Sequence, residues 1–343
     1  MLLLRHHPLN ANDVRQCLRI ATGATLGFLI CKLFGWQNGV FYTVTPILLL
    51  GLIPQVNMHV VRQVLASACV SAVEVGLIAG MLGDRPAMMT LMAFLMFLYR
   101  FMAMSKGSLF LFGATGVINL SIMLHFASFP TTNIEVLISD NIVSSCTSLM
   151  IAYLMMHLWP DVEPRAARPA VEKNANRMRH EALLGSIMAT LSFIVFQVLD
   201  LQDSMSAQAT SLLLLFPMNW DGMLGYARKR AIGTILGVTF GIAVQVILYD
   251  WSNMLIFVVP LLWIGLMIFS QAHVKEASGS GAGFGAMTTL GILFGQYLSP
   301  NGDLIFSALY RMSSIGVAIV ITLMVCFFLH KFLNRFEATR FGA

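Results

Sequence analysis

The sequence predicts an all-α polytopic membrane protein with about twelve transmembrane helices, and three observations support this fold class. Charged residues make up only 11% of the 343 residues and hydrophobic residues 57%, whereas a soluble domain carries roughly 25% charged residues. The mean hydropathy is +0.78. The apolar residues form continuous runs of about the 20 residues that a helix needs to cross a ~30 Å hydrocarbon core. A transmembrane β-barrel would instead alternate in ~10-residue pieces.

Twelve segments of the chain have this character. We expect spans at residues 14–35, 38–54, 60–82, 86–104, 108–128, 136–159, 180–199, 204–218, 228–249, 252–271, 282–300 and 305–331. The two shortest segments end at or beside a proline, Pro54 and Pro217. The composition excludes a disordered chain and an ordinary cytosolic enzyme.

The distribution of positive charge predicts the orientation of these spans. When the N-terminus is placed inside, all but three of the 21 Lys and Arg residues fall on the cytoplasmic side, the exceptions being Lys32, Arg85 and Arg311. Cytoplasmic loops are enriched in Lys and Arg. We therefore expect both termini in the cytoplasm. The net charge of +5 is spread among apolar runs, so no basic groove for nucleic acid is expected.

A polar linker at residues 160–179 divides the chain into two halves of six spans, residues 1–159 and 180–343. The halves share short strings in the same order, among them Phe112-Gly113-Ala114 and Phe284-Gly285-Ala286. Because six is an even number, both halves enter the membrane from the same side. The sequence therefore predicts two parallel six-helix repeats, related by an axis along the membrane normal.

Matching glycine-rich junctions precede the fifth and eleventh expected spans. In repeat-built transporters such interruptions mark the substrate site, and helix N-termini favour anions. The resulting candidate path for a small organic anion comprises Lys106, Gly107, Ser108, Lys275, Gly279 and Ser280. The alternative is a pair of tight loops with small-residue packing. Neither junction has the Gly-Lys-Ser/Thr of a nucleotide-binding loop.

Three ionisable residues inside the expected spans are candidates for transport chemistry, since charges at bilayer depth are costly and usually face a cavity or a partner. Glu74 is the candidate for loading and releasing a proton. The alternative is a carboxylate near the outer mouth, or one satisfied by a Ser, Thr or Arg neighbour. Asp140 and Arg311 occupy equivalent positions in the two halves and are expected to form an outer gate. Two unrelated interfacial charges are the alternative here.

Arg19, Arg62 and Arg230 stand at expected cytoplasmic helix ends. They either anchor the topology or form a basic entrance that collects organic anions. The cysteines are scattered singly, and no His stands at metal-site spacing from a carboxylate. We therefore expect no catalytic residue, no metal and no cofactor, and hence no enzyme.

Several strings resemble the fusaric-acid-resistance-like (FUSC), or aromatic acid exporter, superfamily. They are Leu18-Arg19-Ile20-Ala21, Gly35-Trp36, and Arg230-Ala231-Ile232-Gly233-Thr234-Ile235-Leu236-Gly237, which is similar to the family's Arg-x-x-Gly-Thr-x-x-Gly run. The first half has a degraded copy with Arg62 and Ala66-Ser67. The chain looks like a short branch of the superfamily without the large cytoplasmic domains.

The resemblance implies a multi-pass secondary transporter of a bacterial inner membrane. It would export aromatic or other organic acids, driven by the proton gradient, with an HlyD-type periplasmic adaptor and an outer-membrane channel as partners. A non-transporting assembly subunit or channel is one alternative. A major-facilitator-like transporter is another, although the loop Pro54–His59 lacks that family's usual Gly-x-x-x-Asp-Arg motif. The substrate, the direction, the coupling ion and the oligomeric state stay open.

Overall fold

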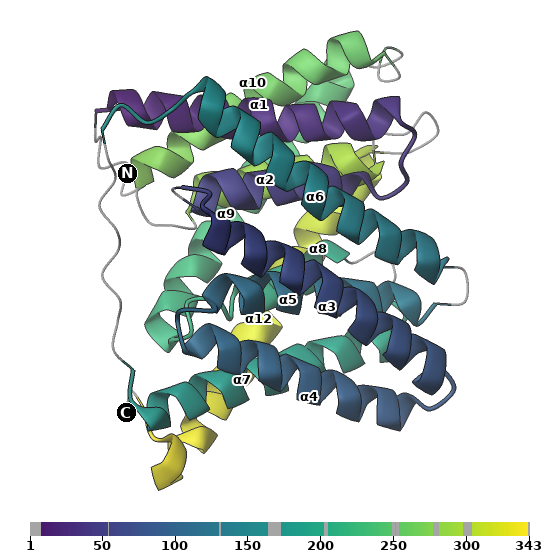
Figure 1. Cartoon of the computed structure of the whole chain (residues 1–343), viewed down its shortest axis with the longest axis vertical. Helices are drawn as coiled ribbons and strands as arrows, with labels where there is room; N and C mark the ends of the chain where they lie inside the picture. Colours follow the sequence, from purple (N-terminus) through teal and green to yellow (C-terminus); the bar gives the residue numbers. More distant parts are fainter. Residues whose placement is uncertain are drawn as a thin grey trace. The chain divides into compact units, whose positions relative to one another are not determined.

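The computed structural model describes residues 8–53, 55–129, 132–163, 173–201, 205–248, 251, 254–276, 281–297 and 304–341. These residues form α-helices and short helical turns, and no strand occurs among them (Figure 1). The helices are α1 (Ala11–Leu33), α2 (Gly39–Leu52), α3 (Met58–Leu82), α4 (Pro86–Ser105), α5 (Phe110–Ala127), α6 (Ile134–Leu158), α7 (Ala175–Val198), α8 (Met205–Leu213), α9 (Trp220–Leu248), α10 (Leu255–Glu276), α11 (Ala282–Ile292) and α12 (Leu304–Leu333).

The predicted fold class is confirmed. Each of the twelve expected segments overlaps one of these helices. Eight of them, α3, α4, α5, α6, α7, α9, α10 and α12, are long and apolar enough to cross a membrane. The chain is therefore a multi-pass helical membrane protein. Whether the shorter or more polar helices α1, α2, α8 and α11 also cross stays a prediction. Helix α11 continues as a π-helical turn, Leu293–Tyr297.

Several helix boundaries differ from the expected ones, and two of the differences have a local cause. Helix α9 begins at Trp220, eight residues before the expected start at 228. The cause is the Asn219 side chain, which accepts a hydrogen bond from the Gly222 N–H at 2.7 Å and so starts the helix early. Helix α8 ends at Leu213 and is followed by a turn that leads to Pro217. The residue before a proline is pushed out of the helical region, so this helix stops earlier than its apolar residues suggested.

The chain forms two compact units. Unit 1 consists of Met1–Met58, Val143–Ala167 and Arg228–Ser313, and unit 2 of His59–Ile142, Arg168–Ala227 and Ser314–Ala343. Each unit therefore takes residues from both halves of the sequence. The chain passes between the units at one point within the linker at 160–179, which separates the predicted repeats, and at four points inside the two halves.

Four helix contacts in unit 1 have a counterpart in unit 2. In unit 1, α1 packs against α2 and α10, and α11 packs against α10 and α2. In unit 2, α7 packs against α8 and α4, and α5 packs against α4 and α8. Replacing each helix by the one six places away in the chain converts one pattern into the other. This correspondence favours the six-helix repeat, which stays a prediction together with its axis.

Within unit 1, small residues bring α9 and α11 into backbone contact. A Cβ added at Gly233 would lie 2.4 Å from the Ala282 carbonyl oxygen, and one at Gly237 would lie 2.7 Å from that of Ala286. Such close approach between membrane helices requires glycine at this spacing. The Arg-x-x-Gly-Thr-x-x-Gly run of α9 is therefore a helix-packing motif.

Candidate functional site

Unit 2 contains a buried ion pair between two long apolar helices, α3 and α4. The Arg100 Nη2 donates to the Glu74 Oε2 at 2.7 Å and to the Ser71 Oγ at 3.2 Å. The Arg100 side chain has no exposed surface and Glu74 retains 10%. Of the environments expected for Glu74, the structure therefore shows a carboxylate with an Arg neighbour. Whether it carries a proton during transport stays a prediction.

The guanidinium of Arg100 lies against α5 on its other sides. Its Cζ atom is 4.4 Å from the centroid of the Phe112 ring, a cation–π contact. A Cβ at Gly116 would lie 2.7 Å from Nη1, so only glycine leaves room for the guanidinium there. Its Nε and Nη1 atoms are buried and have no hydrogen-bond partner among the described residues. Buried donors are normally bonded, so this arginine has unused capacity to bind an acceptor.

The expected path residues of the first junction lie in an exposed turn between α4 and α5. Lys106, Gly107 and Ser108 are exposed, and Gly107 adopts a φ of 77°, which favours glycine. The Ser108 carbonyl accepts from the Gln63 Nε2 at 3.2 Å, while the Phe112 N–H of the first α5 turn donates to the Gln63 Oε1 at 2.9 Å. An amide from α3 thus holds the start of α5.

At the second junction, a carboxylate of the chain itself accepts hydrogen bonds from the backbone N–H groups at the start of α11. Glu276, the last residue of α10, accepts from the Ala282 N–H at 2.7 Å and from the Gly283 N–H at 3.2 Å. Lys275 beside it is half-buried, whereas Gly279 and Ser280 lie outside the described residues. The start of α11 thus favours negative charge, as expected, but Glu276 supplies it. Binding of an organic anion at this junction stays a prediction.

The two expected gate residues are both buried. Asp140 in α6 is 8% exposed and belongs to unit 2, and Arg311 in α12 is 2% exposed and belongs to unit 1. The gate itself stays a prediction.

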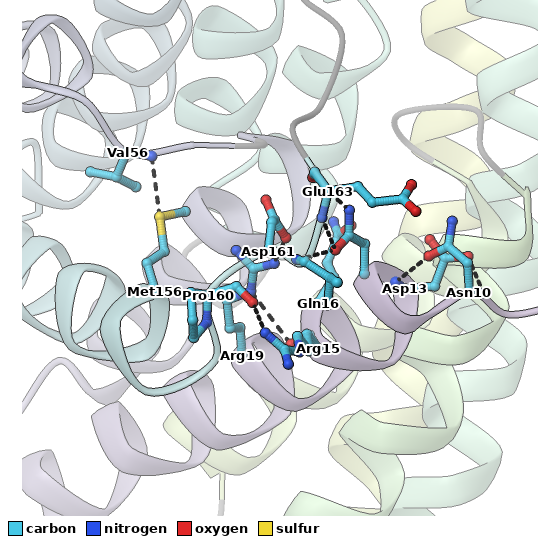
Figure 2. A network of polar contacts seen from close by, with 12 residues as sticks. Asn10, Asp13, Arg15, Gln16, Arg19, Val56, Met156, Pro160, Asp161 and Glu163 are labelled. Atoms are coloured by element: carbon cyan, nitrogen blue, oxygen red, sulfur yellow. Dashed lines mark hydrogen bonds and ion pairs between the residues drawn. The ribbon is translucent and has the colours of Figure 1, made fainter.

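Arg19, expected to anchor the topology or to form part of a basic entrance, pairs with the segment that follows α6. Figure 2 shows this network of unit 1, in which the Arg19 Nη2 donates to the Asp161 carboxylate and Arg15 to the Pro160 carbonyl. Asn12 adds a bond to the Glu163 carbonyl at 2.9 Å. The first residues of the expected linker are thereby tied to α1.

Arg230 is likewise buried, and Arg62 is exposed. The Arg230 Nη1 donates to the Gly285 carbonyl at 3.2 Å and to the Thr288 hydroxyl in α11. In unit 2 the comparable contact from α3 to α5 comes from Gln63. The positions correspond in sequence, since Gln63 precedes Ser67 by four residues and Arg230 precedes Thr234 by four residues. Two of the three expected entrance arginines therefore bond inside their unit, and a common entrance stays a prediction.

Sequence reasoning assigned Arg100 to the cytoplasmic charges and missed its partner. The signal was present: Arg100 precedes the end of an apolar helix by five residues, and Glu74 in the preceding span required a counter-charge. Gln63 and Glu276 were also missed, since their roles depend on backbone groups of neighbouring helices. No group of three or more His, Cys, Asp or Glu side chains that could hold a metal occurs in the part of the chain that the structure describes.

Together, the helices and the buried pair define a polytopic membrane protein with ionisable groups inside its helical units, and such groups commonly mark ion or substrate pathways. Residues 190–325 match the family described as fusaric acid resistance protein-like. Residues 16–155 match a family described as a protein of unknown function, DUF2955. The two matches fit a FUSC-family protein and indicate a membrane transporter of the efflux type. Searches of the curated proteins and of the solved structures found no significant match.

Proposed function

We propose that this protein is a proton-coupled secondary transporter that exports aromatic or other organic acids across a bacterial inner membrane, with both termini in the cytoplasm. The observation that carries the proposal is the Glu74–Arg100 pair in α3 and α4. A carboxylate and a guanidinium held between apolar helices are costly to bury. One can take up a proton and the other can take up an anion, which are the two species such a transporter moves.

The family match supports the transporter class, and the sequence resemblance supports the substrate class. An HlyD-type adaptor and an outer-membrane channel belong to the same proposal, because an exporter of the inner membrane of a double-membrane cell needs a path across the periplasm. An adaptor gene beside the gene for this chain would support this part of the proposal.

The test is counterflow in proteoliposomes that contain the purified protein alone. Radiolabelled benzenesulfonate is a suitable probe, because it stays anionic at every working pH and crosses lipid poorly. The proposal expects uptake of label into vesicles preloaded with unlabelled anion, above that of protein-free vesicles. Absence of counterflow would favour a non-transporting assembly subunit. Counterflow that saturates with concentration would exclude an open channel.

The Glu74→Gln variant tests the coupling part of the same proposal. It should lose the dependence of transport on a pH gradient, because the amide cannot carry a proton. Unchanged dependence in this variant would remove Glu74 from the mechanism.

A further inference from the structure

We propose that Arg100 binds the anionic group of the substrate, and that the Glu74 carboxylate occupies this position when no substrate is bound. The inference rests on the proposed function. It adds the residue that recognises the anion and the sense in which proton and anion are coupled.

The hydrogen bonds of Arg100 leave room for a second acceptor. Glu74 contacts the guanidinium through one oxygen on one nitrogen, Nη2, while Nε and Nη1 have no partner among the described residues. An arginine commonly binds a carboxylate through two parallel N–H···O bonds. A planar organic acid can therefore satisfy more of this guanidinium than Glu74 does, provided that Glu74 withdraws.

The surroundings of the pair suit an aromatic acid. Glu74 keeps 10% of its surface, and Tyr99, whose ring centroid is 5.9 Å from the Arg100 Cζ, is 54% exposed, so the pair lies close below the surface of unit 2. The neighbouring α3 side chains Val73 and Leu77 are apolar and exposed. Once Glu74 withdraws, an acid that enters here meets the guanidinium with its anionic group and apolar or aromatic side chains with its ring.

Charge balance determines how proton and anion are linked. The pair of ionised Glu74 and Arg100 is neutral, and so is the complex of protonated Glu74, Arg100 and a bound anion. An anion bound beside ionised Glu74 would leave a net negative charge, and protonated Glu74 without an anion would leave a net positive charge. Uncompensated buried charges are strongly disfavoured. The site therefore exchanges between empty and loaded by taking up one proton together with one anion.

This coupling has a consequence for the driving force. Proton and anion move in the same direction and carry no net charge across the membrane. Export is then driven by the outward gradient of the acid itself. The resemblance implied export driven by the inward proton gradient, and the arrangement at Arg100 favours the opposite sense of coupling.

The first experiment measures thermal stability of the purified full-length protein in nanodiscs, with and without benzenesulfonate. Glu74→Gln leaves Arg100 without its counter-charge, so this variant should melt below the wild type and recover when the anion is added. Asp161→Asn is the matched control, because Asp161 is 9% exposed and Glu74 10%, and each pairs with a buried arginine. The control should also melt early but should not recover. An E74Q protein that gains no stability from the anion overturns the proposal.

The second measurement uses the wild type and does not depend on whether E74Q folds. Benzenesulfonate binding should tighten on acidification, approaching tenfold per unit of pH where Glu74 is ionised in the empty protein. Because the probe does not titrate, a change in affinity reports a group of the protein. Affinity that is independent of pH, or weaker in acid, overturns the proposal.

Transport separates this inference from the proposed function. In wild-type proteoliposomes, an acidic exterior should drive inward movement of benzenesulfonate if proton and anion move together. Movement in the opposite sense contradicts the role assigned to Arg100 and leaves the transporter proposal intact. No movement under any gradient, together with no counterflow, contradicts the transporter proposal, while the binding and stability measurements still decide whether Arg100 holds an anion.

Discussion

Each compact unit contains, among the described residues, an ion pair whose arginine is buried, Arg19–Asp161 in unit 1 and Arg100–Glu74 in unit 2, and the two carboxylates are exposed to nearly the same extent, 9% and 10%. Their surroundings differ. The first lies in a polar network with backbone carbonyls at the start of α1 (Figure 2). The second lies between long apolar helices, and two of its arginine donors have no hydrogen-bond partner in the part of the chain that the structure describes. The pair in unit 1 thus fixes the segment after α6 to α1. In the pair of unit 2, by our proposal, a substrate anion can replace the carboxylate.

The largest expected effect comes from removing either arginine. Arg100→Leu and Arg19→Leu each leave a buried carboxylate without its partner, which costs about 3–5 kcal/mol of folding free energy. Only the first should abolish transport. Unfolding by denaturing detergent and counterflow measure the two effects. The Glu74→Leu/Arg100→Leu double variant should regain most of the stability and none of the transport, and restored transport would show that the pair is only structural.

A second prediction concerns the glycine beside Arg100. In Gly116→Ala the new methyl group would lie 2.7 Å from the Arg100 Nη1, so we expect a loss of about 1–3 kcal/mol and a lower affinity for the anion. Gly80→Ala is the control, because no atom lies within 4 Å of a Cβ at that position of α3. Equal effects of the two substitutions on unfolding and binding would show that the guanidinium is not confined at Gly116.

A third prediction tests the network around Arg19. Asn12→Ala removes the bond to the Glu163 carbonyl and the bond from the Val162 N–H at 2.6 Å. Since hydrogen bonds of this kind contribute about 0.5–1.5 kcal/mol each, stability should fall by a small amount and transport should be unchanged. Hydrogen exchange of the Val162 amide gives a local measurement. A marked loss of transport would show that this region acts in transport as well as in folding.

The smallest effect is expected at the start of α11. Glu276→Gln keeps an acceptor for the Ala282 and Gly283 N–H groups but removes the negative charge, which is worth about 0.3–1 kcal/mol at a helix N-terminus. A shift in melting temperature measures this loss. If this junction also binds the substrate anion, the same substitution should strengthen benzenesulfonate binding. Unchanged binding would leave Arg100 as the recognition site.

The sequence was sufficient to predict the helices, because the backbone in a membrane forms either helices or closed barrels, and uninterrupted apolar runs of this length fit helices. It also placed Glu74 as the unusual charge of α3. The sequence could not pair Glu74 with Arg100. The spacing of residues within one helix shows which residues share a face, but not which face of another helix they contact. For the same reason the polar residue Asp161 was read as part of a linker, although it bonds to α1.

The predicted anion path also depended on contacts between helices that the sequence does not show. The glycine-rich junctions precede the starts of α5 and α11, and the structure shows a neutral amide at the first start and a carboxylate at the second. Identifying the occupant required knowing that the α10 end brings Glu276 back onto the first turn of α11, and that Gln63 of α3 reaches the start of α5. Side chains that cap a helix from outside it have no fixed spacing in the sequence.

The exchange of helices between the sequence halves has a consequence for biogenesis. The ribosome completes α1 and α2 long before it makes α10 and α11, against which they pack. Newly made α1 and α2 therefore stay without their final neighbours until synthesis is nearly finished. A truncated product that ends after α6 would expose these faces, and quality-control proteases of the cell should remove it rather than let it accumulate as a half-size protein.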